Sequence, residues 1–591
     1  MRHLNEIPFV ASSRRPSSTR SRALLRHASA ILLFGLTLSV RCLAAQTSSA
    51  TSGQLEIATG LQQLRSGHAS EAKTSFDAAV RAAPRSADAL TWRGISENQL
   101  GLYAAAAADF RAALRLDRNT LPAHYNLALS LIRLHETDAA IEQLKFVIGV
   151  QPNALQPRFN LALLLEEKNQ RQEAATQLQA AHAIEPDDSG VVLHLLDDIL
   201  KLRQMQDVPK LVQALQGTSI GPGLKQHAGT SLLEAGEFKE AVMLLKAAHQ
   251  QEPAQVEIAM LLARAYIGAG RYEDAVVLLE PAVASGTAGA TYLSALAYSG
   301  TGNRQKAVDA FQHAAALDPH DARPLYHLGL LAASSPDARS QATDLLRSAI
   351  KLDPHNETYA LALARILLEQ DQAAEALRVI AQTKISSAES LTLEGIATIS
   401  LRGVASAQPI LQRAVVQNPD FALAQDLLGF CLYKQGNYAK AAEAYKVAAD
   451  QEPSRLVYLH NTALAYYRAN QIPQALNYAQ RASSIPDTTA DDHALLGKVY
   501  VAAGRQQEAL PELQRAVELN PELESAYYTL ARTYMRMGDR QQATNWSEKL
   551  SALKQRHAAS SATAVESDAS SVRSSTLLSG NVISVDEESF P

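Results

Sequence analysis

The chain has little cysteine, no strong excess of either charge and few aromatic residues. Only two of its 591 residues are cysteine, Cys42 and Cys431, which excludes a disulfide framework and a cysteine-rich zinc site. Lysine and arginine number 55 against 60 acidic residues, and this net charge of −5 argues against a strongly basic nucleic-acid binder. Aromatic residues make up 5%, apolar residues 47% and charged residues 19%, a globular composition typical of helical proteins rich in alanine and leucine.

The first 45 residues have the composition of a targeting segment. They contain many arginines, no lysine and one acid, Glu6, and they include the apolar run ILLFGLTLSV at 31–40. Small residues follow, so we predict a secretory signal peptide cut after Ala44 or Ala45, and a polar linker at 46–52. The apolar run is shorter than the about 20 residues that a membrane-spanning helix needs. An organelle transit peptide and an uncleaved anchor remain as alternatives.

Beyond this segment the chain repeats itself at one short period. Prolines followed mostly by polar residues are separated by one or two steps of about 34 residues, and they lie at positions 84, 152, 186, 253, 319, 354, 419, 453, 486 and 521. A fixed period of this length is the sequence signature of a repeat architecture. We expect each proline to end one repeat and to be able to start the next helix, where its missing N–H costs nothing.

Within each period the same residue types recur at fixed distances before the proline. A small residue lies 24 positions before it, an alanine 12 before it and a large apolar residue 8 before it, as in Gly429, Ala441 and Tyr445. Steps of three and four residues mark one face of a helix. A turn between the two halves often contains glycine, as at Gly436. Each repeat is therefore predicted to be two antiparallel helices that approach closely at the small residue.

This pattern resembles the tetratricopeptide repeat (TPR) family. The clearest units are FALAQDLLGFCLYKQGNYAKAAEAYKVAADQEPS (421–454) and DDHALLGKVYVAAGRQQEALPELQRAVELNPEL (491–523), and about fifteen units fill residues 53–554. The resemblance implies an all-α, right-handed superhelical solenoid of antiparallel helix pairs. A degenerate unit near 189–223 predicts two blocks, 53–221 and 222–554. The serine-rich tail 555–591 is predicted to be disordered.

The repeats leave no room for a separate catalytic domain, and the chain has no His-Glu-x-x-His motif. His194 with Asp197 and Asp198 has helical spacing that permits a metal, but further ligands are missing, and we predict no metal site. Cys431 is expected to be a buried, inert thiol. We therefore predict that the chain is not an enzyme and has no catalytic residues and no cofactor.

The resemblance to TPR arrays implies that the first helices of successive units line a binding groove. Asn126, Asn160 and Asn461 share one phase of these helices, and their amides could pair with an extended peptide backbone. Tyr125 and Phe159 precede two of them and could cover ligand side chains, and Arg133 lies two turns beyond Asn126. The alternative is that these asparagines only tie one unit to the next.

The motif by which some TPR domains grip the C-terminal carboxylate of a chaperone is not supported. Thr91, Ile95 and Gln156 stand where lysine and asparagine would be needed. Recognition of that carboxylate is therefore not expected here.

These observations predict an exported, non-enzymatic scaffold that binds proteins or extended peptides in the cell envelope, without nucleic acid and at most peripheral to a membrane. The alternative is an accessory subunit of an envelope export or polysaccharide secretion machine whose outer-membrane barrel is a separate chain. A third reading is an enzyme built on the array itself. The oligomeric state stays open.

Overall fold

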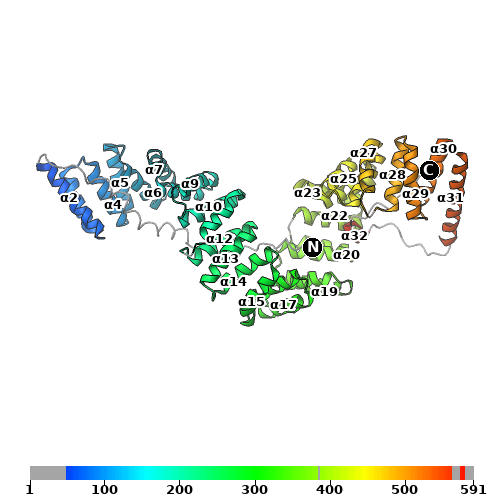
Figure 1. The fold of residues 1–591 in the computed structure, drawn as a ribbon, viewed down its shortest axis with the longest axis horizontal. Coiled ribbons are helices and arrows are strands. Elements are labelled where there is room, and N and C mark those ends of the chain that lie inside the picture. The colour runs from blue at the N-terminus through cyan, green and yellow to red at the C-terminus, as the bar shows by residue number, and fades with distance from the viewer. Residues whose placement is uncertain (1–47, 218, 384–385, 487, 562–572, 580–591) are drawn as a thin grey trace. The chain divides into compact units, whose positions relative to one another are not determined.

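The computed structural model describes residues 48–217, 219–383, 386–486, 488–561 and 573–579, and these residues contain helices and no strand (Figure 1). The predicted all-α solenoid of antiparallel helix pairs is confirmed. The chain divides into two compact units, unit 1 (1–303) and unit 2 (304–591). The predicted signal peptide, 1–45, lies outside the described residues.

Unit 1 alternates first and second helices of successive repeats, and most helices pack against their neighbours in the chain, whereas α11 packs against α10 and α13. Its helices are α2 (Ser48–Arg65), α3 (Ala69–Ala82), α4 (Ala87–Gln99), α5 (Tyr103–Leu116), α6 (Leu121–Arg133), α7 (Thr137–Val150), α8 (Leu155–Glu167), α9 (Arg171–Ile184), α10 (Ser189–Lys201), η3 (Met205–Asp207), α11 (Val208–Leu215), α12 (Pro222–Ala235), α13 (Phe238–Gln251), α14 (Val256–Gly268), α15 (Tyr272–Ala284) and α16 (Ala288–Gly300).

Unit 2 continues the same alternation and adds one short helix from the tail. Its helices are α17 (Arg304–Leu317), α18 (Ala322–Ala333), η4 (Pro336–Ala338), α19 (Arg339–Leu352), α20 (Glu357–Glu369), α21 (Ala373–Thr383), α22 (Ala388–Arg402), α23 (Val404–Gln417), α24 (Ala422–Lys434), α25 (Tyr438–Gln451), α26 (Leu456–Arg468), α27 (Ile472–Ser483), α28 (Ala490–Ala502), α29 (Gln506–Leu519), α30 (Glu524–Met537), α31 (Arg540–Ser561) and α32 (Ser574–Ser579).

The small residue of each first helix lies directly against the large residue of the second helix, as the sequence predicts. A methyl group built on Gly429 would lie 2.7 Å from Cδ1 of Tyr445, and one on Gly94 would lie 2.7 Å from Cε1 of Phe110. Both rings are fully buried. The two backbones can approach this closely only because no side chain stands between them.

The turn between the two helices of a repeat is left-handed even where it lacks glycine. The glycines that the sequence predicts in these turns have positive φ angles, for example 78° at Gly436. Five repeats place another residue there with φ between 58° and 60°: His135, Asn169, Arg203, Asp371 and Asn470. The fold thus places residues other than glycine in this turn, at the greatest cost for Arg203, since asparagine and aspartate adopt the left-handed conformation more readily.

The prolines that mark the period lie in the turns between repeats, not at the first position of the next helix. Pro84 stands between the end of α3 and the start of α4, and Ser86 caps α4 by accepting a hydrogen bond from the backbone N–H of Ala89, 3.2 Å away. The capping side chain, rather than the proline, satisfies one of the free N–H groups at this helix start.

The limits of the elements and units differ from the expected ones at four places. Residues 48–52, assigned to the linker, belong to α2, and α31 continues to Ser561, beyond the expected end at 554. Residues 574–579 of the tail, expected to be disordered, form α32, because Ser574 and Leu577 find buried contacts in unit 2. The compact units divide between 303 and 304 rather than at 221.

The degenerate repeat near 189–223 keeps its apolar face but loses length. Its second helix, α11, has 8 residues, whereas most second helices have 14. Val208, Leu211, Val212 and Leu215 are buried and replace the usual small and large residues. Among the described residues, no helix combines the length and the apolar character that crossing a membrane requires.

Candidate functional site

The predicted groove asparagine of α6 is bonded within its own helix by its side chain and to the preceding repeat by its backbone. Asn126 is 8% exposed, and its side-chain amide donates to the backbone oxygen of Pro122, 2.8 Å away. Its backbone oxygen accepts a hydrogen bond from the side chain of Asn98 in α4 at 3.2 Å. The side-chain oxygen of Asn98 in turn accepts from the hydroxyl of Ser130, 2.8 Å away. The two bonds of Asn98 tie α4 to α6, whereas the bond between Asn126 and Pro122 lies within α6.

Two other predicted residues meet each other across α6 and α8. The amide of Asn160 donates to the hydroxyl oxygen of Tyr125, 3.2 Å away, and both side chains are partly exposed. Burial raises the pKa of Tyr125 to about 12, so the phenol stays protonated. Phe159 is buried and packs edge-on against His194, with ring centres 5.4 Å apart. Arg133 lies apart from this group, 6.0 Å from the centre of the Tyr103 ring.

Asn461 lies in unit 2 and is almost completely buried. Its amide donates to the carboxyl of Asp426 at 2.9 Å, which ties α26 to α24. Burial raises the pKa of Asp426 to about 7. The nearby phenol oxygens of Tyr445 and Tyr458 are buried without a hydrogen-bond partner. The amides of Asn126 and Asn461 thus serve contacts inside the array, and ligand contact by the predicted groove residues stays a prediction.

Four further residues form a regular row that the sequence analysis did not identify. One aliphatic side chain from each of α2, α4, α6 and α8 is partly exposed, and each directly follows the small residue of its helix: Leu61, Ile95, Leu129 and Leu163. We call this set the aliphatic row. Its steps equal the 34-residue period, and that recurrence next to the small residue is the signal that could have revealed it. At α10 the same step falls on Asp197.

The three residues that suggested a metal are directed to three different elements. His194 pairs with Glu166 of α8 at 3.1 Å, Asp197 with His227 of α12 at 3.1 Å, and Asp198 with Arg171 of α9 at 3.2 Å. Within the described residues, no group of three potential ligands is arranged to hold a metal ion. The side chains instead join neighbouring repeats by ion pairs and hydrogen bonds.

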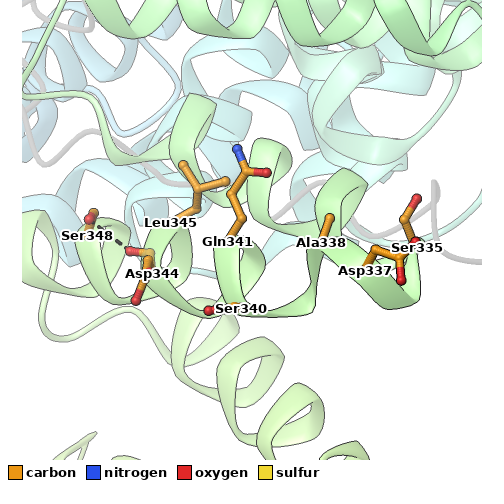
Figure 2. A pocket seen from close by; sticks show the side chains of 8 residues that line it. All are labelled: Ser335, Asp337, Ala338, Ser340, Gln341, Asp344, Leu345 and Ser348. Carbon is orange, nitrogen blue, oxygen red and sulfur yellow. Dashed lines mark hydrogen bonds between the residues drawn. The ribbon is translucent and has the colours of Figure 1, made fainter.

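A surface hollow of about 660 Å³ lies along α19 (Figure 2). Its lining comes from the turn before η4, from η4 itself and from α19: Ser335, Asp337, Ala338, Ser340, Gln341, Asp344, Leu345 and Ser348. The hydroxyl of Ser348 donates to the backbone oxygen of Asp344, 2.9 Å away. Since the walls come from one helix and its entry turn, the hollow does not gather side chains from several repeats as the aliphatic row does.

Cys431 lies fully buried within α24, as expected. Burial raises the pKa of its thiol to about 12, which keeps it protonated and unreactive. The expectation that the chain is not an enzyme stays a prediction.

Comparison with protein families matches tetratricopeptide-repeat models along both units. Two models described as "Tetratricopeptide repeat" match residues 57–119, 125–189, 292–357 and 392–455, and residues 232–297. A "TPR repeat" model matches 497–538, and a further "Tetratricopeptide repeat" model matches 524–557. The matched segments together cover more than half of the chain and follow the helix pairs described above.

Known proteins share parts of the array. The chain is 34% identical over 85 residues to "Small glutamine-rich tetratricopeptide repeat-containing protein 2" of Mycosarcoma maydis, which covers 14% of this chain and 24% of that protein. It is 26% identical over 342 residues to a "TPR repeat-containing protein" of Treponema pallidum, and the matched region covers 54% of this chain and 42% of that protein. The chain thus spans less than half the length of these relatives.

Among solved structures, the chain is similar to one titled "Crystal structure of APC/C hetero-tetramer Cut9-Hcn1", with 13% identity and a TM-score of 0.35 over 76% of this chain and 99% of that one. The family matches, the helix pairs and their close contacts lead to one conclusion. The chain belongs to the tetratricopeptide-repeat family and is a helical scaffold for protein–protein interaction.

Proposed function

We propose that the aliphatic row of unit 1 binds an extended segment of a partner protein. The observation that carries the proposal is the row itself, with one partly exposed aliphatic side chain on each of four successive first helices. Apolar side chains that recur in line on a surface are a common feature of binding sites. A ligand that covers all four would bury their remaining exposed area.

The spacing of the row suggests the register of the ligand. Packed helices lie about 8–10 Å apart. A polyproline II segment rises about 3.1 Å per residue, so three residues span about 9 Å. One apolar ligand side chain at every third position would therefore meet one row residue each, and a segment of about ten residues would cover the row.

Polar groups beside the row suit a peptide backbone. Asn160 gives one N–H to Tyr125 and has a second N–H and a carbonyl oxygen in its amide. Both side chains are partly exposed on α6 and α8, next to Leu129 and Leu163. Hydrogen bonds from the Asn160 amide and the Tyr125 hydroxyl to the peptide backbone would fix the orientation of the bound segment, which the apolar contacts alone do not.

The test combines crosslinking and recovery of partners with a double variant, Leu129→Ala/Leu163→Ala. We expect partner recovery to fall at least tenfold, since both truncations remove apolar area that the ligand would cover, and each Å² of such area contributes about 25 cal/mol. The matched control is Val277→Ala in α15, which truncates a side chain that is 65% exposed and lies outside the row. Equal recovery by the double variant and the control, with unchanged melting temperatures, would overturn the proposal.

We further propose that the chain acts after export, in the cell envelope. The support is the composition of residues 1–45, with its arginines, its short apolar run and the small residues that follow. N-terminal sequencing of the protein purified from its own cells should give a first residue directly after Ala44 or Ala45. An intact N-terminus on protein recovered from the cytosol would contradict export.

A further inference from the structure

The short helix α32 lies far along the chain from the helices it contacts. It packs against α20 and α22, as Figure 1 shows for the red helix beside them. Ser574 is 1% exposed, and its hydroxyl donates to the backbone oxygen of Leu368, 2.8 Å away. Leu577 is fully buried in the same apolar cluster as Ile396 and Ile399 of α22. Hydrogen bonding and burial thus act together at this contact.

The surface that α32 covers corresponds to the surface that carries the aliphatic row in unit 1. Ile396 directly follows the small residue Gly395, as Leu129 follows Ala128. Leu129 is partly exposed, whereas Ile396 is 0% exposed. Phe430, at the same position of α24, is buried as well, so burial at this position does not require α32. The packing of α32 against α20 and α22 is what places a segment of the chain itself on these first helices.

The contact has a recognisable chemistry. The oxygen of Leu368, near the end of α20, accepts the backbone N–H of Asp371 at 3.1 Å and also accepts the serine hydroxyl, which lies 3.3 Å from the Asp371 carboxyl. Leu577 lies three residues after Ser574, and residues three apart share one face of a helix. Leu578 packs partly buried beside it. The recognised pattern is Ser-x-x-Leu-Leu on a single helical turn.

We propose that the α20–α22 surface is a second binding site, for short helical Ser-x-x-Leu-Leu segments of partner proteins, and that α32 is its built-in competitor. A helix of six residues is barely stable alone, so α32 is held by its contacts with α20 and α22, and a partner segment that makes the same contacts can replace it. Its attachment to the same chain gives it a high effective concentration, which keeps the site closed to weak ligands. The site lies in unit 2 and is independent of the aliphatic row.

The test uses a fluorescent peptide of residues 571–581 and the full-length chain. In the wild type, α32 should compete with the peptide. In the Leu577→Asp chain, the acid cannot occupy the apolar site, and the peptide should bind at least tenfold more tightly. The matched control is Val585→Asp, which also replaces an aliphatic residue of the tail by aspartate but lies after α32, and which should bind the peptide as weakly as the wild type does.

A milder variant guards against loss of folding. Ser574→Ala removes the hydroxyl that reaches Leu368 and should tighten peptide binding about fivefold, the effect of one ordinary hydrogen bond. A peptide with Leu577→Asp should not bind any of these chains. Equal peptide affinity for the wild type and both α32 variants would overturn the proposal. The proposal would also be overturned if the wild type were a dimer and Leu577→Asp converted it to a monomer, because α32 would then bind the α20–α22 surface of a second copy.

Discussion

The first helices α6 and α8 of unit 1 and α22 and α26 of unit 2 follow the same repeat but present different surfaces. In unit 1 the aliphatic row is partly exposed, and the contact between Asn160 and Tyr125 is partly exposed as well. In unit 2 the corresponding residue of α22, Ile396, is covered, and the contact between Asn461 and Asp426 is buried. The comparison teaches that the repeat determines where a side chain lies, while neighbouring segments determine whether it is exposed.

The largest expected effect concerns the buried polar contact of unit 2. Because burial raises the pKa of Asp426 from 3.8 to about 7, the folded state holds a proton that the unfolded chain loses. The stabilisation that comes from the protonated Asp426 is complete below about pH 4. It falls as the pH rises from about 4 to about 7 and stays low above that. Asp426→Asn removes this dependence and should be more stable than the wild type at pH 8, by at most about 4 kcal/mol.

Urea unfolding of both proteins at pH 4 and pH 8 measures this difference. Asn160→Asp in unit 1 is the contrasting variant, because that side chain is partly exposed and an ionised carboxylate there remains hydrated. If the unfolding free energy of Asp426→Asn depended on pH as that of the wild type does, the buried Asn461–Asp426 contact would not differ from the partly exposed Asn160–Tyr125 contact in its response to pH.

The second prediction tests whether the two units share the same close helix contact. Gly94→Val in unit 1 and Gly429→Val in unit 2 place side-chain atoms against Phe110 and Tyr445, and each should lose about 3 kcal/mol of unfolding free energy. Gly149→Val is the control, because nothing lies within 4 Å of its added carbon. Thermal unfolding followed by circular dichroism compares them. A loss in only one unit would break the equivalence of the repeats.

The smallest expected effect concerns a left-handed turn. Arg203 in unit 1 has a φ of 58°, whereas the glycine at the same position of another repeat, Gly436 in unit 2, has 78°. Arg203→Gly should stabilise the protein by about 0.5–1 kcal/mol, since relief of the unfavourable conformation exceeds the added freedom of the unfolded chain. Differential scanning calorimetry measures it. A lower melting temperature would show that Arg203 makes a stabilising contact that outweighs the strain.

The sequence allowed the helix pairs and their packing to be predicted, because both depend on residues close together in the chain. Gly429 and Tyr445 are 16 positions apart within one repeat, and the periodic pattern places them face to face. The turns at His135 and Asp371 were less visible, because histidine and aspartate occur in left-handed turns less often than glycine and so mark a turn less clearly.

The candidate site was harder to predict, because it depends on contacts between repeats. The shared phase of Asn126 and Asn461 was evident, but the partner of Asn461 is Asp426, 35 positions away in another repeat. The burial of Leu577 was beyond reach, because its serine-rich surroundings have the composition of a disordered tail and its contacts lie about 200 residues earlier.

The shortened helix α11 has a consequence for how unit 1 comes apart. In a linear array each repeat is held only by its two neighbours, so stability adds up along one dimension. With 8 residues, α11 offers about two turns of contact where the other second helices offer almost four. Cooperativity is therefore weakest at this step, and the repeats before α10 and those from α12 onward can melt as separate blocks.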